Sequence, residues 1–223
     1  WWLLIDQVLN LQYDLDDDSG RAMQVRMMAV DSGGSEGVTE NAYEFWRQLR
    51  NDPQGRNYHR RVQLLKGASH ASAPLTRIDY PNAERKDRRA SARGEVPVLM
   101  INTNQVKDLV NNMLGREDPG GGMVFFPAWL PDWWYVELTA ESRTAKGWVN
   151  PGKRRNEAFD LLVYCMALCH SSKIRMPLID WSNPPSWAAE WDHNDMVGEP
   201  DNFRFEIHPK GDISLRDLAA KLA

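Results

Sequence analysis

The sequence predicts an α/β fold whose sheet is at least partly parallel. Apolar stretches of strand length alternate along the chain with segments in which apolar residues recur at helical spacing. The chain has 223 residues, of which 42% are hydrophobic and 26% charged, and this composition supplies a sizeable core for one domain. No apolar run approaches the roughly 20 residues needed to cross a bilayer, so we expect a folded protein of the cytoplasm.

The first part of the chain predicts two strands and one helix. Residues 1–10 are largely apolar, with a single acidic residue, and predict a buried strand. The next apolar run, "MQVRMMAV", ends at Asp31 and two glycines, as expected of a strand that meets a turn. Residues 39–50 predict a helix with Thr39 as its cap. The apolar residues at helical spacing in this segment are Ala42, Phe45, Trp46 and Leu49.

The middle of the chain repeats the alternation of strand and helix. The stretch "RRVQLLKGAS" predicts a strand that ends at Lys66 and Gly67, and "VPVLMINT" predicts the next strand. Residues 103–114 predict a helix. Its apolar face consists of Val106, Leu109, Val110 and Met113. The stretch "GGGMVFFPAW" predicts a glycine-rich turn and a short strand, and the last long helix is expected to start near Asn156.

The composition changes after residue 172. The stretch "PLIDWSNPPSWAAEW" is rich in proline and tryptophan, and "ISLRDLAAKLA" predicts a short amphipathic helix capped by Ser214. We therefore expect one domain over residues 1–172 and an extension over residues 173–223. This extension either packs on the domain or docks onto a partner, as amphipathic helices often do.

The charges are unevenly distributed. A net charge of −4 excludes a protein coated uniformly with basic groups. Residues 84–93 nevertheless hold five basic and two acidic residues, and residues 153–155 form a second basic cluster. These clusters could hold a nucleic-acid backbone, or they could be two solvated loops.

Two aspartates are the main candidates for chemistry. Asp31 is expected at the carboxyl edge of the sheet, where α/β proteins place active sites, although an aspartate there can also cap the following turn. Asp160 lies off the apolar stripe of the last helix, with Asn156, Glu157 and Tyr164 as surface neighbours. The stripe consists of Ala158, Leu161, Leu162, Cys165 and Met166. A carboxylate near a helix start can also simply stabilise the helix dipole.

A helix-borne aspartate that faces an aspartate at a sheet edge provides the oxygen ligands that a divalent cation requires. Two such ions about 4 Å apart can activate a water and stabilise the leaving oxygen of a phosphodiester, as in many nucleases. Lys153, Arg154 and Arg155 lie within a turn or two of Asp160 and could hold a DNA backbone against the metals. The pattern therefore favours a metal-dependent nuclease.

Other chemistries have weaker support. No G-x-x-x-x-G-K-[ST] motif occurs, and the glycines at 120–122 predict a plain turn. Cys165 and Cys169 lie one helical turn apart and predict buried reduced thiols, since with His170 they would supply only three zinc ligands. Ser32 in "DSGG" has no histidine partner that the sequence identifies, and the strand before it disfavours a serine protease.

Five blocks of the sequence together resemble the nuclease domain of the phage terminase large subunit, in the family of the lambda-type packaging enzyme. In chain order they are "AVDSGG" (29–34), "LLKGAS" (64–69), "VKDLVNNML" (106–114), "ELTAES" (137–142) and "KRRNEAFDLLVYCMAL" (153–168). The resemblance covers roughly residues 1–170, and its most specific element is the "RRNEAFD" helix.

The resemblance implies an RNase H-like fold, with a mixed sheet flanked by helices, that cuts concatemeric viral double-stranded DNA during genome packaging. It implies Mg²⁺ or Mn²⁺ as cofactor, with Asp31 and Asp160 as catalytic metal ligands. Further candidates for DNA contact or for support of the site are Lys66, Lys107, Glu141, Arg154 and Arg155. The expected partners are double-stranded DNA, the terminase small subunit and, through the C-terminal extension, the procapsid portal, in the host cytoplasm and without a membrane.

The chain departs from the family at its start. The family places its first catalytic aspartate on a strand just before the block that resembles "WWLLID", and this chain begins at Trp1. We therefore expect an isolated nuclease domain that lacks this ligand and the ATPase domain. Two alternatives are a DNA-binding and assembly module of the packaging motor without cleavage activity, and another RNase H-like nucleic-acid hydrolase.

Overall fold

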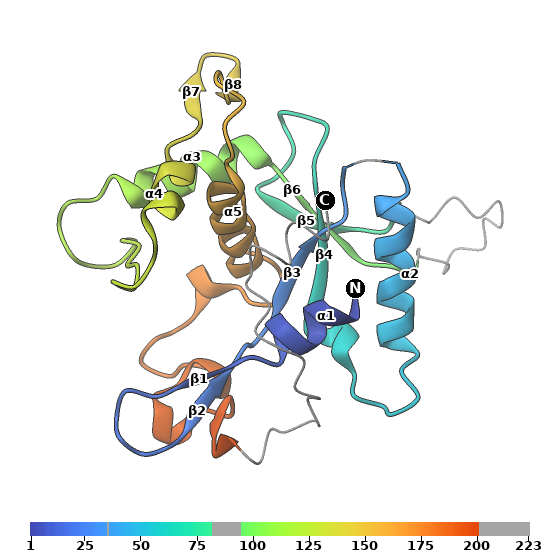
Figure 1. Cartoon of the computed structure of the whole chain (residues 1–223), viewed down its shortest axis with the longest axis vertical. Coiled ribbons are helices and arrows are strands. Elements are labelled where there is room, and N and C mark those ends of the chain that lie inside the picture. Colours follow the sequence, from blue (N-terminus) through green and yellow to red (C-terminus); the bar gives the residue numbers. More distant parts are fainter. Residues whose placement is uncertain (35, 82–94, 201–223) are drawn as a thin grey trace. The chain divides into compact units, whose positions relative to one another are not determined.

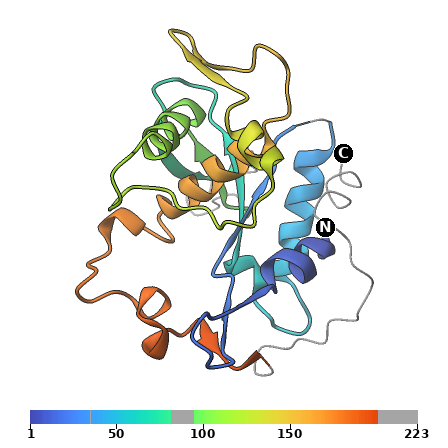
Figure 2. The ribbon, with the colours of Figure 1, turned by 60° about the vertical axis from the view of Figure 1, so that its left-hand side comes forward.

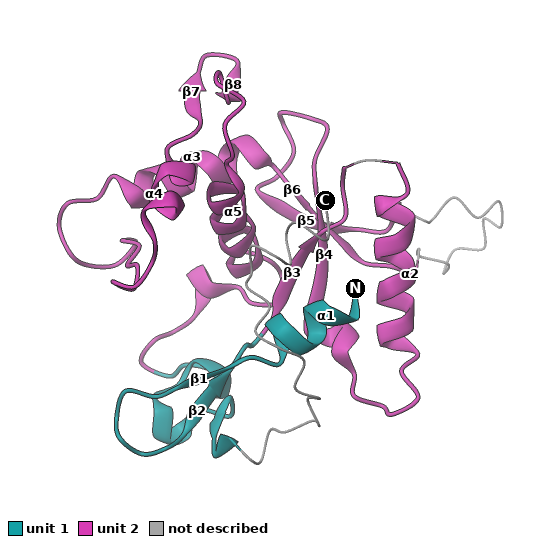
Figure 3. Cartoon of the chain, viewed as in Figure 1, with its two compact units in different colours: residues 1–26, 183–223 teal, residues 27–182 magenta. Residues whose placement is uncertain are grey.

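The computed structural model describes residues 1–34, 36–81 and 95–200. The chain divides into two compact units (Figure 3). Unit 1 comprises residues 1–26 and 183–223, and unit 2 comprises residues 27–182. The basic stretch at residues 84–93 and the predicted C-terminal helix with Ser214 lie outside the described residues.

Unit 2 is built on a four-stranded mixed sheet in the order β3-β4-β6-β5 (Figure 1). Its strands are β3 (Met28–Asp31), β4 (Val62–Gly67), β5 (Thr76–Asp79) and β6 (Val98–Ile101). β3, β4 and β6 are parallel, and β5 pairs antiparallel with β6 at the edge. The prediction of an α/β fold with a partly parallel sheet is therefore confirmed, as are the expected strands that end at Asp31 and Gly67.

Helices cover both faces of this sheet (Figure 1 and Figure 2). The helix α2 (Val38–Arg50) packs on one face, where Ala42, Trp46 and Leu64 belong to one buried cluster. The helices α3 (Thr103–Leu114) and α5 (Glu157–Cys169) pack on the other. The core on that second face includes Leu65, Leu99, Ile101, Val106, Val110, Phe159, Val163, Met166 and Ala167. Because side chains alternate along a strand, Asp31 shares the face of Ala29, which packs against this second core.

Smaller elements complete unit 2. The helix α4 (Asp132–Leu138) packs against α5, and a hairpin of β7 (Ser142–Thr144) and β8 (Gly147–Val149) follows it. Two 3₁₀-helices, η2 (Tyr58–Arg60) and η4 (Met176–Leu178), lie in connections.

Unit 1 has a small antiparallel sheet in the order β1-β2-β9. The strands are β1 (Gln12–Asp14), β2 (Ala22–Gln24) and β9 (Val197–Gly198), and the 3₁₀-helices η5 (Ser186–Ala188) and η6 (Trp191–His193) precede β9. Arg21 pairs with Asp17 at 2.8 Å and with Asp192 at 2.9 Å, which joins the two sequence segments of this unit.

The predicted strand at residues 1–10 is wrong. The segment forms the helix α1 (Trp2–Leu4) and the π-helix η1 (Ile5–Leu9), which ends where the Asn10 N–H donates to the Ile5 carbonyl at 2.9 Å. Ile5 and Leu9 are buried, whereas Gln7, which a strand would place on their face, is only half-buried. A short apolar run does not by itself distinguish a strand from a helix.

Two further local predictions are corrected. Thr39 does not cap α2, because the chain turns at Gly37, whose φ is 84°, and the Thr39 hydroxyl donates instead to the Ser32 carbonyl at 2.8 Å. The stretch "GGGMVFFPAW" forms the expected turn, with positive φ at Gly120 and Gly122, but no strand among its residues, all of which are described. No neighbouring strand pairs with it, and α4 begins shortly afterwards.

The predicted apolar stripe of α5 is only partly correct. Ala158 and Met166 are buried, but Leu161 is 53% exposed and Cys165 is exposed. The cysteines are free as expected, although Cys165 is not the buried thiol that the sequence predicted. Because this helix is apolar on most of its circumference, periodicity alone does not fix which face packs against α3 and α4.

Candidate active site

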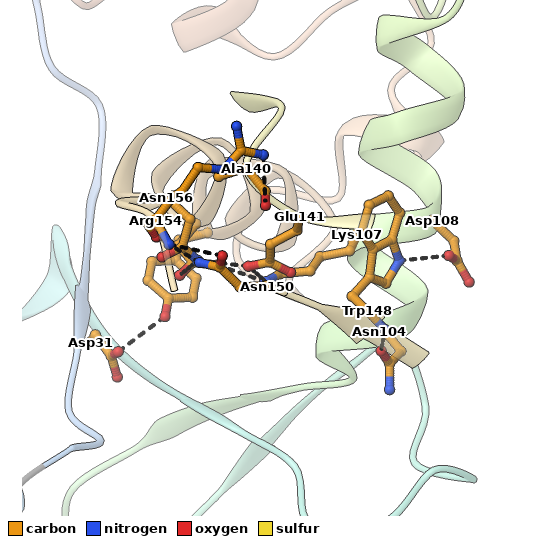
Figure 4. Close-up of polar contacts among 12 residues, drawn as sticks. Asp31, Asn104, Lys107, Asp108, Ala140, Glu141, Trp148, Asn150, Arg154 and Asn156 are labelled. Atoms are coloured by element: carbon orange, nitrogen blue, oxygen red, sulfur yellow. Dashed lines mark hydrogen bonds and ion pairs between the residues drawn. The ribbon is translucent and has the colours of Figure 1, made fainter. Parts of the chain in front are cut away.

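Asp31 is the last residue of β3 and lies at the carboxyl end of the parallel strands. Its Oδ1 accepts a hydrogen bond from the Gly33 backbone N–H at 2.7 Å. Its Oδ2 accepts one from the Tyr164 hydroxyl of α5 at 3.0 Å (Figure 4). Asp31 therefore stabilises the turn that follows it, and the same carboxylate also faces α5.

Gly33 lets the backbone approach two of the predicted site residues. A Cβ at this position would lie 3.2 Å from Asp31 Oδ1 and 3.8 Å from Lys66 Cγ. Lys66 follows Leu65, the register partner of Asp31, and thus lies near Asp31 at the same edge of the sheet. A larger residue at position 33 would press on the Asp31 carboxylate.

Asp160 lies in the first turn of α5, and both of its carboxylate oxygens have partners. Oδ1 forms an ion pair with Lys107 Nζ at 2.9 Å. Oδ2 accepts a hydrogen bond from Asn156 Nδ2 at 2.9 Å. These contacts fix the orientation of the side chain, which remains 32% exposed.

Glu141 and Lys107 form a buried ion pair beside Asp160 (Figure 4). Lys107 Nζ lies 2.6 Å from Glu141 Oε1, and the two side chains are 8% and 6% exposed. Glu141 Oε1 also accepts a hydrogen bond from Asn156 Nδ2 at 2.6 Å. The Lys107 ammonium lies 5.3 Å from the centre of the Phe159 ring. A buried charge is tolerated where it is paired and hydrogen-bonded, and each charge of this pair meets that condition.

Tyr164 connects Asp31 to the acids on the other side of the site. It follows Asp160 by one helical turn and donates its hydroxyl to Asp31. Burial raises the pKa of Tyr164 above its ordinary value, and the negative charges of Asp31, Asp160 and Glu141 raise it further. The Tyr164 hydroxyl is therefore bonded to Asp31 and is influenced by the charges of Asp160 and Glu141, which come from other parts of the chain.

A comparison with known protein families identifies the family of this chain. The model of the family described as "Terminase large subunit gpA, endonuclease domain" matches residues 1–181 of the chain. The chain belongs to this family. No curated protein and no solved structure matches the chain.

The family match confirms the resemblance seen in the sequence, and the terminase nuclease domain has the expected class of fold. Its mixed sheet with helices on both faces is consistent with an RNase H-like nuclease fold. Within the part of the chain that the structure describes, no helix is both long and apolar enough to cross a bilayer.

The two arginines before α5 have different surroundings in the terminase nuclease domain. The Arg154 guanidinium donates to the carbonyls of Thr139 and Ala140 at 3.0 and 3.2 Å, next to Glu141 in the chain. Arg155 is 63% exposed and pairs with Glu137 and Glu157 at 3.5 and 3.3 Å. Arg154 therefore holds the segment that carries Glu141.

Arg155, in contrast, presents its charge to solvent. Its ion pair with Glu157 joins two exposed side chains and therefore contributes little to stability, whereas its other partner, Glu137, is buried. Its guanidinium is therefore accessible to an anionic ligand at the start of α5.

The acids have the right chemistry for a divalent cation, but their oxygens are already engaged. Carboxylate oxygens are the ligands that Mg²⁺ and Mn²⁺ prefer, and Asp31 and Asp160 present them from a strand end and a helix. Among residues 1–34, 36–81 and 95–200, however, no three acidic, histidine or cysteine side chains are arranged to hold a metal ion. The carboxylate donors fit such an ion by their chemistry. In this structure, Lys107 forms an ion pair with one oxygen each of Asp160 and Glu141.

Three residues that organise the site were not predicted as site residues, although the sequence placed two of them beside Asp160. Asn156 divides its two amide hydrogens between Glu141 and Asp160, and Tyr164 donates to Asp31. Both lie four residues from Asp160, so their spacing on the helix was the available signal. The buried Glu137 accepts the Ala158 N–H at 3.0 Å and so stabilises the start of α5, a role that no local pattern indicated.

We expect the substitution Tyr164→Phe to lower DNA cleavage without unfolding the domain. It removes the hydroxyl that orients Asp31 and keeps the ring, and loss of such a supporting contact typically costs about ten- to a hundredfold in metal affinity or activity. The rate of plasmid nicking in Mn²⁺ measures the effect. Tyr135→Phe, on the half-exposed face of α4, is the matched control, and equal rates for both variants would contradict the role of Tyr164.

Proposed function

We propose that the chain is a metal-dependent endonuclease of viral DNA packaging that cuts concatemeric double-stranded DNA by two-metal-ion hydrolysis. The observation that carries this proposal is that Asp31 at the sheet edge accepts a hydrogen bond from Tyr164, on the helix that also carries Asp160, in a chain of the terminase nuclease family. Clustered carboxylates at the carboxyl edge of a sheet are the donor set that such hydrolysis requires.

In this proposal Asp31 and Asp160 are the catalytic residues and hold Mg²⁺ or Mn²⁺. Bound ions of this kind supply an activated water and stabilise the leaving oxygen of the phosphodiester. Tyr164 holds the Asp31 carboxylate in place, and Asn156 does the same for Asp160. Lys107 and Glu141 support the site as a buried ion pair beside Asp160.

The basic groups near the acids support DNA as the substrate. Lys66 lies beside Asp31 at the sheet edge, and the exposed Arg155 lies at the start of the helix that carries Asp160. Cationic side chains on either side of the acids can contact the phosphates of a duplex. Arg154 contributes by orienting the segment before α5.

Membership of the family supports DNA and packaging partners in general. We propose that the domain acts in the host cytoplasm with the terminase small subunit, and that residues 173–223 form an extension of the nuclease domain at 1–172 that docks on the procapsid portal.

The proposal predicts that plasmid cleavage requires a divalent ion and Asp31. With Mn²⁺ we expect cutting that EDTA abolishes, and we expect Asp31→Asn to lower the rate at least about a hundredfold, because it removes an anionic ligand and keeps the shape of the side chain. Agarose gels of supercoiled plasmid, with gel-shift assays at low salt, measure cleavage and binding separately.

Asp79→Asn is the matched control for this experiment. Asp79 also ends a strand, but it pairs with Val98 at the amino end of β6 and forms an exposed ion pair with Arg77. It should cut like the unmodified chain. Cleavage by Asp31→Asn at the control rate would refute the assignment, and DNA binding without cleavage in any divalent ion would favour an assembly module instead.

A further inference from the structure

The segment at residues 142–155 is strongly basic, and we call it the basic arm. It contains no acidic residue. Its five basic residues are all exposed, and they are Arg143, Lys146, Lys153, Arg154 and Arg155. The hairpin of β7 and β8 forms the first part of the arm and projects beyond α3, α4 and α5 (Figure 1 and Figure 2). The arm therefore presents a group of positive charges to solvent.

Both ends of the basic arm lie at the candidate active site. The arm begins directly after Glu141 and ends directly before Asn156. The Asn156 amide donates to Glu141 Oε1 at 2.6 Å and to Asp160 Oδ2 at 2.9 Å, so these contacts close the arm at its base. A polymer bound at these acids therefore has the arm within its reach.

The hairpin part of the basic arm is fixed on α3. Asp108 accepts hydrogen bonds from Arg143 Nε at 2.6 Å and from Trp148 Nε1 at 2.8 Å. Asn104 Oδ1 accepts the Trp148 backbone N–H at 3.0 Å. At Gly147 φ is 123°, and a Cβ there would lie 2.8 Å from Asn104 Oδ1, so the close approach to α3 requires glycine. These contacts hold the hairpin in one position.

The second part of the basic arm is also held by local contacts. Asn150 Nδ2 donates to the Arg154 carbonyl at 2.6 Å, and Asn150 Oδ1 accepts the Arg154 N–H at 3.0 Å. Within this turn Lys153 has a φ of 47°, a left-handed conformation that lysine seldom adopts. Such conformations persist where the surroundings enforce them, and they cluster at sites that bind ligands.

Most of the positive charge of the basic arm is not neutralised. Arg143 and Arg155 form ion pairs with carboxylates. In the part of the chain that the structure describes, no carboxylate pairs with Lys146, Lys153 or Arg154, and the Arg154 guanidinium donates to backbone carbonyls. Cations held close together repel one another, and an anionic ligand relieves this repulsion. Phosphates spaced along a nucleic-acid backbone are ligands that fit such an array.

The arm has the features expected for duplex DNA and lacks those expected for a single strand. Proteins that bind single strands usually stack aromatic side chains on the bases. The basic arm has a single aromatic residue, Trp148, whose ring lies 5.3 Å from the Phe159 ring and is tied to Asp108. An array of cations on a fixed scaffold instead suits the regular backbone of a duplex.

We propose that the basic arm binds the phosphate backbone of duplex DNA beside the cleavage site, with Lys146 and Lys153 as its main contacts. The inference rests on the proposed nuclease function and adds a DNA-binding surface that extends beyond Lys66 and Arg155. The arm contributes affinity and places the duplex, and the acids carry out the cleavage.

The test measures binding of a short labelled duplex to the whole 223-residue chain by fluorescence anisotropy, in EDTA so that no cleavage occurs. We expect the double variant Lys146→Gln and Lys153→Gln to bind about tenfold or more weakly at about 0.1 M salt. The slope of log affinity against log salt should fall by about two, one for each lost phosphate contact.

The double variant Arg60→Gln and Arg175→Gln is the matched control. It also removes two exposed positive charges, but these lie before the start of β4 and after the end of α5. It should bind the duplex like the unmodified chain.

Equal binding by the arm variant and the control variant would overturn the inference and leave the proposed function intact. A loss of affinity by the arm variant for a single strand alone would do the same. No duplex binding by the unmodified chain, even at low salt with Ca²⁺ present, would overturn the proposed function and the inference with it. If circular dichroism shows that the double arm variant does not fold, the two single variants replace it, each with a slope lowered by about one.

Discussion

Replacing Asp160 with asparagine is expected to lower the rate of DNA cleavage at least about a thousandfold, because the proposed metal site loses an anionic ligand at its centre. The loss should appear in the chemical step and not in folding. Asparagine has nearly the same shape, its oxygen can still accept from Asn156, and Lys107 keeps Glu141 as a buried partner at 2.6 Å. Single-turnover cleavage of a short duplex in Mn²⁺ measures the effect, and gel shifts in Ca²⁺ test whether DNA still binds.

Glu157→Gln is the matched control for this substitution. Glu157 is the first residue of the same helix, but its carboxylate is exposed and pairs with Arg155 at 3.3 Å. We expect its cleavage rate to stay within about threefold of the unmodified chain, since a surface ion pair contributes little. Wild-type cleavage by the Asp160→Asn protein would remove Asp160 from the catalytic residues, whatever its structural contacts.

The two aspartates could be singled out from the sequence because each belongs to a local pattern. Asp31 ends an apolar strand before two glycines, and Asp160 lies off the apolar stripe of its helix, among polar neighbours. The positions of strands and helices along the chain could be inferred in the same way, from apolar runs and their spacing. The structure agrees with these predictions for β4, β6, α2, α3 and α5.

The contacts among the site residues could not be predicted in this way. Lys107 meets Asp160 because α3 packs beside α5, and it also meets Glu141, which is 34 positions away in the segment between α4 and β7. Tyr164 reaches Asp31 over 133 positions because α5 packs against β3. Such pairs depend on how helices pack on the sheet, and hydrophobic periodicity does not specify which polar side chains then become neighbours.

Phe159→Ala is expected to destabilise the domain by about 3–5 kcal/mol, the usual cost of removing a buried aromatic side chain from a core. Phe159 is 1% exposed and packs in the core between the sheet and the helices α3 and α5. Its ring lies 5.3 Å from the Trp148 ring and 5.3 Å from the Lys107 ammonium. The substitution therefore leaves a cavity, and it also removes the ring against which the buried cation is held. Equilibrium unfolding in urea, followed by tryptophan fluorescence, measures the change.

Leu161→Ala is the matched control, because it truncates a large apolar side chain at an exposed position of the same helix. Leu161 lies two residues further along α5 and is 53% exposed, so its truncation should change the free energy of unfolding by less than about 1 kcal/mol. Equal unfolding midpoints for the two variants would contradict the packing of α5 described above. If only Phe159→Ala is destabilised, we also expect weaker Mn²⁺ binding by this variant than by Leu161→Ala, at temperatures where both are folded. The reason is that Lys107, Glu141 and Asp160 would no longer be held in one arrangement.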